Sequence, residues 1–187
     1  MRNEKMKLVV GLIGPIGSGK GSIGDYLCEN HNASRHTISS ILADVLKRLH
    51  LSVTRERLQK LGASLRTELG HDVIVNALRG DVEEDESNII IIDGIRYANE
   101  VDMLRTFENN LLLGIDAKPE VRYGRCVIRG EKGEGKITFD EFLANESRET
   151  EKNIRDVMKK TDYLINNNGT REELIKRLEE ILAEKGI

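Results

Sequence analysis

The chain has 187 residues, 39% of them hydrophobic and 33% charged, which is typical of one soluble globular domain that buries about 70% of its unfolded surface. The formal net charge is -3, which argues against a nucleic acid as the main partner, because nucleic-acid-binding proteins usually carry a basic excess. The apolar run Leu8 to Ile13 is too short to span a bilayer or to form the core of a signal peptide. We therefore expect a cytoplasmic protein with no membrane partner, and the sequence does not indicate its oligomeric state.

Short apolar runs along the chain predict a parallel sheet of five strands. Such runs without polar alternation are typical of strands that are buried on both faces. Three of them are Lys7 to Ile13, Asn88 to Asp93 and Leu111 to Ile115. A shorter strand is expected at Tyr163 to Ile165, and a weaker one near Arg35 to Ile38.

Helical patterns alternate with these strands. Amphipathic or helix-opening segments are predicted at Lys20 to Asn30, Ile41 to Leu49, Thr54 to Leu69 and Leu174 to Leu182, the last capped by Thr170. This alternation favours a three-layer α/β fold, with helices on both faces of the sheet. Ligands of such sheets bind beyond the carboxyl ends of the strands.

The loop after the first strand has the spacing of a phosphate-binding loop. Gly14 is followed by four residues, including Gly17 and Ser18, and then by Gly19 and Lys20 at the start of a helix. Glycines let the backbone N–H groups surround a phosphate, the helix adds its positive dipole end, and the lysine reaches the β- and γ-phosphate oxygens. We therefore predict that this loop binds ATP and that Lys20 is catalytic.

The two residues after the lysine narrow the class of protein. Gly21 stands where many such loops place a hydroxyl on Mg²⁺, and Ser22 follows one position later. The run Gly-Ser-Gly-Lys-Gly-Ser resembles the adenylate kinase family. That resemblance implies that the ion is held chiefly by phosphate oxygens and water, with Ser22 as a candidate protein ligand, and it counts against a GTPase.

Asp93 is predicted to end its strand beside the phosphate loop. An acid there suits water-mediated contact with Mg²⁺ or the orientation of an acceptor hydroxyl, although it would also suit a simple turn cap. Gly94 follows, so the chain lacks a glutamate to activate water at that point. Asp93-Gly94-Ile95-Arg96 resembles the Asp-Gly-Phe-Pro-Arg stretch of nucleoside monophosphate kinases, shortened by one residue. The resemblance implies that Arg96 grips the acceptor phosphate; an ion pair with Glu100 is the alternative.

Two further segments resemble acceptor-binding parts of nucleotide kinases. Gln59 to Arg66 resembles the Leu-Gln-x-Leu-Gly…Arg helix of phage-type deoxynucleoside monophosphate kinases and their uncharacterised archaeal relatives, which implies that Arg66 binds an anion. Ser39 lies where adenylate kinases have Ser-Thr-Gly-Asp, which implies contact with the acceptor. The arginine expected after it is absent, since Ala43 occupies that place and Lys47 comes one turn later.

Arginines near residue 125 predict a lid. Arg122, Arg125 and Arg129 lie at i, i+3 and i+7, so a helix would place them on one face, where a bound triphosphate would neutralise them. We assign Arg125 and Arg129 a catalytic role, with Arg148 as a further candidate; pairing with nearby glutamates is the alternative. The glycines and charges of Gly130 to Lys136 predict a mobile loop, as lid closure requires.

The segment Asp162 to Thr170 resembles dephospho-CoA kinases and related small nucleotide kinases, in which an Asp-Tyr-x-Ile-x-Asn strand precedes a Gly-Thr or Gly-Ser turn. The resemblance implies that Asn168 and Gly169 flank the adenine of ATP. The acidic run Asp81 to Glu86 is predicted to be a solvated turn.

These features predict one P-loop kinase domain over residues 1–187, with an acceptor-binding helical segment at about 39–80 and a lid at about 122–150. We expect it to transfer the γ-phosphoryl of ATP, with Mg²⁺, to a nucleoside or deoxynucleoside monophosphate held by Ser39, Arg66, Asp93 and Arg96. Asp93 and Ser22 are the candidate Mg²⁺ ligands. Dephospho-CoA is the alternative acceptor, and a regulatory ATPase without a small acceptor is the alternative class.

Overall fold

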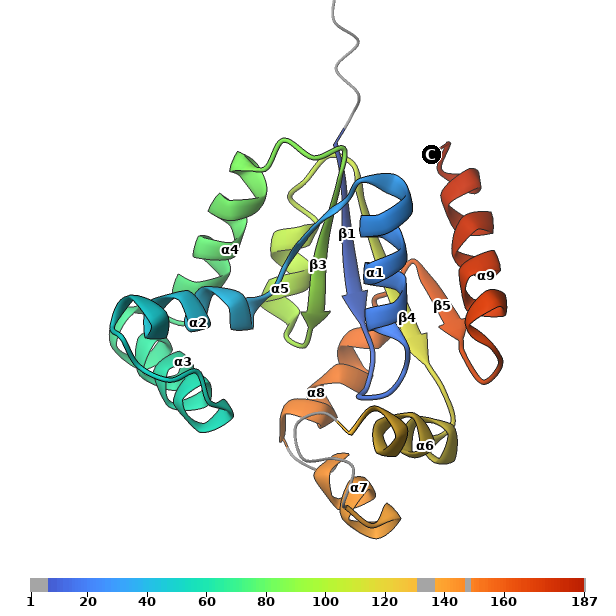
Figure 1. Cartoon of the computed structure of the whole chain (residues 1–187). Helices are drawn as coiled ribbons and strands as arrows, with labels where there is room; N and C mark the ends of the chain where they lie inside the picture. The colour runs from blue at the N-terminus through green and yellow to red at the C-terminus, as the bar shows by residue number, and fades with distance from the viewer. Residues whose placement is uncertain (1–6, 131–136, 147–148, 187) are drawn as a thin grey trace, which may run out of the picture.

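The computed structural model describes residues 7–130, 137–146 and 149–186. Five strands form one sheet in the order β2-β3-β1-β4-β5, and every neighbouring pair is parallel (Figure 1). The strands are β1 (Leu8–Ile13), β2 (Ser34–His36), β3 (Ile89–Ile95), β4 (Asn110–Asp116) and β5 (Tyr163–Asn166). The predicted five-stranded parallel sheet is confirmed.

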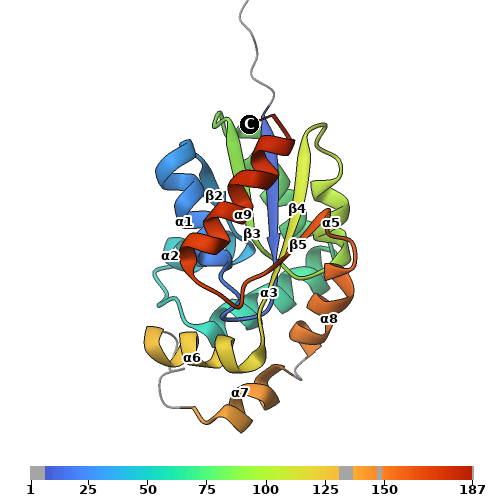
Figure 2. The same cartoon turned by 90° about the vertical axis from the view of Figure 1, so that its right-hand side faces the viewer.

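Helices cover both faces of this sheet (Figures 1 and 2). One face is covered by α1 (Lys20–His31) and α9 (Arg171–Glu184), and the other by α4 (Val73–Glu84), α5 (Ala98–Leu104) and α8 (Glu149–Met158). In Figure 1, α2 (Ile38–Arg48) and α3 (Arg55–Leu69) lie to the left of the lower part of the sheet, and α6 (Pro119–Arg129) and α7 (Phe139–Glu146) lie below it. The three-layer architecture is therefore confirmed.

The core forms because the strands are apolar on both faces. All six residues of β1 are buried, and alternate strand side chains contribute to two separate clusters. One cluster joins the sheet to Ile23 and Leu27 of α1 and to the apolar stripe of α9. The other joins it to α4, α5 and α8. Each fully buried Leu or Ile side chain contributes about 1.5–3 kcal/mol of transfer free energy, so the sheet is a rigid support for its loops.

The structure corrects three boundaries. The run at residues 81–86 is not a solvated turn, because its first four residues continue α4, where Val82 is fully buried at i+7 from Val75. Strand β3 runs two residues beyond Asp93 to Ile95. Strand β2 ends at His36, since Thr37 caps α2, accepting a hydrogen bond from the backbone N–H of Ser40 at 2.9 Å.

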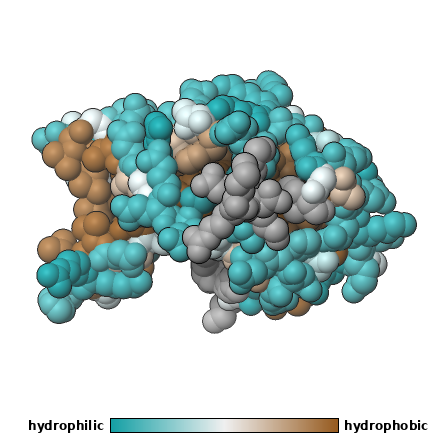
Figure 3. All heavy atoms as spheres, turned by 90° about the horizontal axis from the view of Figure 1, so that it is seen from above, coloured by the Kyte–Doolittle hydropathy of each residue, from teal (hydrophilic) through white to brown (hydrophobic). Residues whose placement is uncertain are grey.

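The apolar faces of α2 and α3 are only partly buried against the rest of the protein. Of the residues predicted to form the inner face of α2, Leu42 and Leu46 are buried, whereas Leu49 is 59% exposed. Figure 3 shows a hydrophobic region on the side of the molecule where α2 and α3 lie. The exposed apolar side chains of α2, α3 and the loop between them are Val45, Leu49, Leu51, Val53 and Leu69. No helix in the described ranges is long and apolar enough to cross a membrane.

A hydrogen bond between His36 and Asp85 joins β2 to the end of α4. His36 Nε2 lies 2.7 Å from Asp85 Oδ2, and Asp85 Oδ1 accepts a hydrogen bond from the Ser87 backbone N–H at 2.8 Å. Burial acts to raise the pKa of Asp85, but the hydrogen bonds of its side chain outweigh burial and hold that pKa well below the ordinary value. The charged carboxylate therefore stabilises the fold.

We expect Asp85→Asn to lower the free energy of unfolding by about 1–3 kcal/mol at pH 7. Since the folded-state pKa is depressed, this stabilisation is complete above the unfolded-state pKa of about 3.9 and is lost as the pH falls toward the folded-state value. Urea unfolding of both proteins at pH 7 and at pH 3 measures the effect. The difference between them should shrink at the lower pH, and an equal difference at both would contradict the role of the charge.

Candidate active site

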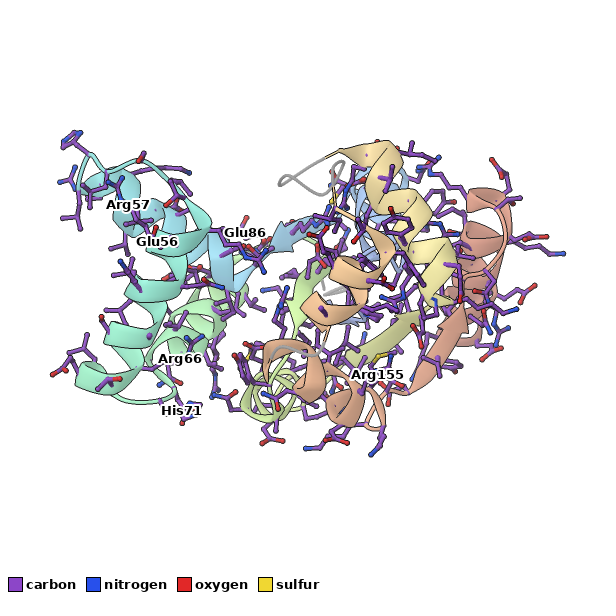
Figure 4. All side chains as sticks on the ribbon, turned by 90° about the horizontal axis from the view of Figure 1, so that it is seen from below. Glu56, Arg57, Arg66, His71, Glu86 and Arg155 are labelled. Atoms are coloured by element: carbon purple, nitrogen blue, oxygen red, sulfur yellow. The ribbon has the colours of Figure 1, made fainter. Side chains whose placement is uncertain are left out.

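The carboxyl ends of the strands point to the lower edge of the sheet in Figure 1, where the loop after β1 lies between α2 and α3 on one side and α6 to α8 on the other. Figure 4 looks onto this edge from below and labels Arg66 on α3 and Arg155 on α8. Ligands of open parallel sheets bind at this edge. The elements that carry the predicted site residues therefore converge there.

Gly17 and Gly19 of the phosphate loop occupy positions that suit only glycine. Gly17 has φ +74° and Gly19 has φ +108°, a region that other residues rarely adopt. A Cβ on Gly17 would lie 2.6 Å from the Arg122 carbonyl oxygen, and one on Gly19 would lie 2.2 Å from the Asn167 side-chain nitrogen. The loop is therefore packed directly against α6 and against the turn after β5.

Lys20 begins α1 and folds back over the loop. Its Nζ donates hydrogen bonds to the carbonyl oxygens of Gly14 at 2.6 Å and Pro15 at 3.0 Å. Ser18 is fully buried, and its Oγ has no hydrogen-bond partner within the described ranges. The ammonium of Lys20 thus lies at the loop, where the phosphates of a nucleotide would bind.

The next two residues of α1 are the ones that departed from the common phosphate-loop pattern. Gly21 is exposed, and Ser22 is half-buried in the first turn of the helix. Ser22 stays a predicted Mg²⁺ ligand.

Asp93 is bound by an arginine that the sequence reasoning missed. The carboxylate is not at the end of its strand but inside β3, where Asp93 pairs with Leu12 before the register shifts. Arg35 of β2 donates two hydrogen bonds to Asp93 Oδ2, from Nε at 3.0 Å and from Nη2, and a third to Asp25 Oδ1 at 2.7 Å. Arg35 could have been found only by pairing β2 with β3, because 58 residues separate it from Asp93.

Glu100 organises the segment after β3. The side chain is 3% exposed, and its Oε2 accepts hydrogen bonds from the backbone N–H groups of Arg96 at 2.7 Å and Tyr97 at 3.3 Å. Burial raises the pKa of Glu100, although these amides and the charges of Arg66 and Arg96 act in the opposite direction. Arg96 itself is exposed. Glu100 is thus a buried carboxylate next to two of the predicted acceptor-binding arginines.

A cavity of about 220 Å³ lies beside Glu100. Arg66 reaches it from α3 and lies with Cζ 5.8 Å from the centre of the Tyr97 ring, within the range of a cation–π contact. The residues that line it are Arg66, His71, Val75, Tyr97, Asn99 and Glu100. The structure therefore brings Arg66 to the segment that follows Asp93 and Arg96.

The remaining residues expected on the acceptor side lie on α2. Ser39 is exposed in the first turn, with its Oγ 3.0 Å from the Thr37 Oγ1. Lys47, which follows the missing arginine, pairs instead with Asp44 at 2.9 Å on the exposed surface. A contact of Ser39 with an acceptor remains a prediction.

The three lid arginines do not form one solvent-facing set. Arg122 is 1% exposed, and it donates hydrogen bonds to the carbonyl oxygens of Ala117 at 2.9 Å and Ile16 at 3.3 Å. Helix α6 turns this side chain inward against the phosphate loop, and its contact with a bound triphosphate stays a prediction. Arg129 is exposed at the end of α6. Arg148 and residues 131–136 of the expected mobile loop lie outside the described residues.

Arg125 bridges α6 to the turn after β5. Its Nη1 donates to the Asn167 carbonyl oxygen at 2.9 Å, and its Nη2 donates to the Gly169 carbonyl oxygen at 3.0 Å. Asn168 Oδ1 accepts a hydrogen bond from the Lys118 backbone N–H at 2.7 Å. Arg125 therefore adjoins Asn168 and Gly169, the residues expected beside adenine, and its action on the transferring phosphoryl stays a prediction.

Asn167 was missed by the sequence reasoning. It is 5% exposed, and its Nδ2 donates to the Ser18 carbonyl oxygen at 2.7 Å, which joins the turn after β5 to the phosphate loop. Its place after a strand in a run of three asparagines gives no signal that distinguishes it from its neighbours. Packing alone selects it.

The candidate Mg²⁺ ligands are consistent with an ion held mainly by phosphates. Within the described ranges there is no group of three or more His, Cys, Asp or Glu side chains that could hold a metal. Mg²⁺ in nucleotide sites commonly uses one or two protein carboxylates together with phosphate oxygens and water. Asp93 and the Ser22 hydroxyl suit that limited protein contribution, and their contact with Mg²⁺ stays a prediction.

The sheet order, the covered faces and the phosphate loop together define a P-loop kinase fold. Shikimate kinase from Bacteroides thetaiotaomicron is similar over 94% of this chain and 98% of that chain, with a TM-score of 0.65 and 17% identity. Shikimate kinase from Acinetobacter baumannii in complex with shikimate gives a TM-score of 0.55 at 16% identity, over 97% of this chain and 96% of that chain. These likenesses establish the fold.

Relatives at the sequence level carry only a provisional name. The chain is 27% identical over 184 residues to a UPF0200 protein of Pyrococcus horikoshii, covering 95% of this chain and 97% of the relative. It is 24% identical over 177 residues to a UPF0200 protein of Hyperthermus butylicus, covering 95% and 94%. No protein-family model matches the chain. The named nucleotide kinase families are therefore resemblances on motifs, and the relatives name no substrate.

Proposed function

We propose that the protein is an ATP-dependent phosphotransferase that acts on a nucleoside or deoxynucleoside monophosphate. One observation carries the proposal: the phosphate loop with Lys20 and the cavity lined by Arg66 and Glu100 occur together at the carboxyl edge of one sheet. A nucleotide-binding regulator needs the first of these features but has no use for the second. Asp93 lies on the strand that leads from the sheet to the cavity.

The chemistry asked of the protein is positioning and charge stabilisation, because phosphoryl transfer needs no covalent intermediate. Lys20 and the loop amides would hold the β- and γ-phosphates, and Arg125 would close the adenine end. Asp93 would orient the acceptor, with Arg35 fixing its carboxylate. Bound Mg²⁺ would neutralise part of the phosphate charge, with Asp93 and Ser22 as its protein contacts.

Arginines on the acceptor side favour a phosphorylated acceptor. Arg66 and Arg96 both lie near Glu100, since their charges act on its pKa, and guanidinium groups bind phosphate in a bidentate manner. Dephospho-CoA remains the second candidate, favoured by the turn at residues 167–170 that joins β5 to α9. Coupled turnover of ATP with monophosphates and with dephospho-CoA distinguishes the two candidate acceptors. Shikimate, the ligand named for one structural neighbour, is added to the panel. Stimulation by a monophosphate well above the basal ATPase rate supports the proposal, and a flat panel contradicts it.

We expect Arg66→Ala to raise the KM for the monophosphate acceptor by about 10- to 100-fold, because it removes a charge-assisted hydrogen bond worth about 1.5–3 kcal/mol. The KM for ATP should change less than threefold, since Arg66 lies on α3, away from the phosphate loop (Figure 4). Initial-rate kinetics with each substrate varied in turn measure both constants. Arg57→Ala, on the exposed first turn of the same helix, is the matched control. Equal effects on both KM values would remove Arg66 from the acceptor site.

A further inference from the structure

Glu100, which lines the cavity, has one carboxylate oxygen that accepts no hydrogen bond from the described residues. Glu100 Oε2 accepts the two backbone hydrogen bonds, whereas no donor among the described residues contacts Oε1. Glu100 is 3% exposed and lines the cavity, so Oε1 is the carboxylate oxygen that a ligand bound there would contact.

Such an oxygen selects hydrogen-bond donors. Burying a carboxylate oxygen without a hydrogen-bond donor costs free energy. A ligand that supplies an N–H group to this oxygen therefore binds more tightly, whereas a ligand that places an oxygen there is repelled. The cavity is also lined by the Tyr97 ring, with the Arg66 guanidinium over it, and such groups suit a flat ring. The volume of about 220 Å³ is below the 300–1,000 Å³ usual for drug-sized ligands, so it suits one ring of a larger acceptor.

We infer that this cavity is the base subsite of the acceptor and that Glu100 Oε1 selects a base with an amino group, of the cytosine type, over its oxo counterpart. The inference rests on the proposed function, whose acceptor class it narrows. Carboxylates accept hydrogen bonds from the exocyclic amine of cytosine, and a uracil would place its O4 against Oε1. Glu100 then reads the ring, and the Arg66 guanidinium over Tyr97 lines the same cavity.

Glu100→Gln tests this directly. The amide oxygen can replace Oε2 as the acceptor for the backbone N–H groups of Arg96 and Tyr97, so the local fold is kept. The amide nitrogen then replaces Oε1 and turns an acceptor into a donor. Isothermal titration with CMP and UMP, in the presence of a non-hydrolysable ATP analogue, measures the consequence without requiring turnover.

The wild-type protein should bind CMP about 10- to 100-fold more tightly than UMP, and Glu100→Gln should abolish or reverse that preference. Glu56→Gln, an exposed carboxylate on α3, is the matched control and should leave it unchanged (Figure 4). Circular dichroism and thermal unfolding establish that Glu100→Gln is folded. Equal wild-type affinities, or an unchanged preference in Glu100→Gln, would overturn the assignment.

Failure of this inference is separable from failure of the proposed function. Transfer to CMP and UMP with equal KM values would remove Glu100 as the selector but leave the kinase in place. A preference for CMP that depends on Glu100, without transfer, would contradict the kinase and retain the subsite. Absence of binding by both monophosphates would contradict the subsite, whereas the kinase is contradicted only when no acceptor in the panel stimulates turnover.

Discussion

Lys20→Ala should lower kcat for phosphoryl transfer by about 10³-fold, the size of effect seen when one pre-organised charge is removed from a transition state. In this structure the Lys20 ammonium rests on the carbonyl oxygens of Gly14 and Pro15, at the loop that would hold the phosphates. Those carbonyls can be solvated when the side chain is shortened. The fold should therefore survive, and the loss should lie in catalysis.

Initial rates at saturating ATP and acceptor measure the loss of kcat, and nucleotide-binding titrations measure any loss of ATP affinity. Lys47→Ala is the control, because Lys47 is an exposed lysine that pairs with Asp44 on α2. It should retain wild-type kcat. A Lys20→Ala protein that turns over normally would show that this loop does not perform the chemistry proposed for it.

Arg122→Ala should lower the free energy of unfolding by about 2–4 kcal/mol, which is the second large effect we expect. Arg122 is among the largest fully buried side chains, and it lies with Cζ 5.5 Å from the centre of the Phe142 ring. Its removal leaves a cavity and takes hydrogen bonds from the carbonyl oxygens of Ala117 and Ile16. Because Ile16 belongs to the phosphate loop, ATP affinity should fall as well.

Urea unfolding and ATP titration of Arg122→Ala measure these two losses. Arg125→Ala is the comparison, since Arg125 lies three residues away on the same helix but is only partly buried. It should cost little stability while weakening ATP binding, because its contacts are with the turn after β5. If Arg122→Ala were as stable as Arg125→Ala, the buried guanidinium would not be supporting the loop.

Local patterns in the sequence carried most of the fold. Strand β1 and helix α1 follow from an apolar run and a glycine loop, and the last helix follows from its stripe and from Thr170, whose Oγ1 accepts a hydrogen bond from Glu173 N at 3.2 Å. Such signals depend on a few consecutive residues, so they can be read without knowing what packs nearby. The prediction of a solvated turn at residues 81–86 was wrong because Val82, although surrounded by acidic residues in the sequence, completes the apolar face of α4.

The sequence alone thus determined the class of fold, the phosphate loop and the residues near it, because glycine geometry and strand burial are local properties. Only the tertiary structure decided which distant side chains meet. It paired Arg35 with Asp93 across neighbouring strands, turned Arg122 inward, and enclosed Glu100 in a cavity with Arg66. Those outcomes depend on strand order and on the rotation of each helix against the sheet, which periodicity does not specify.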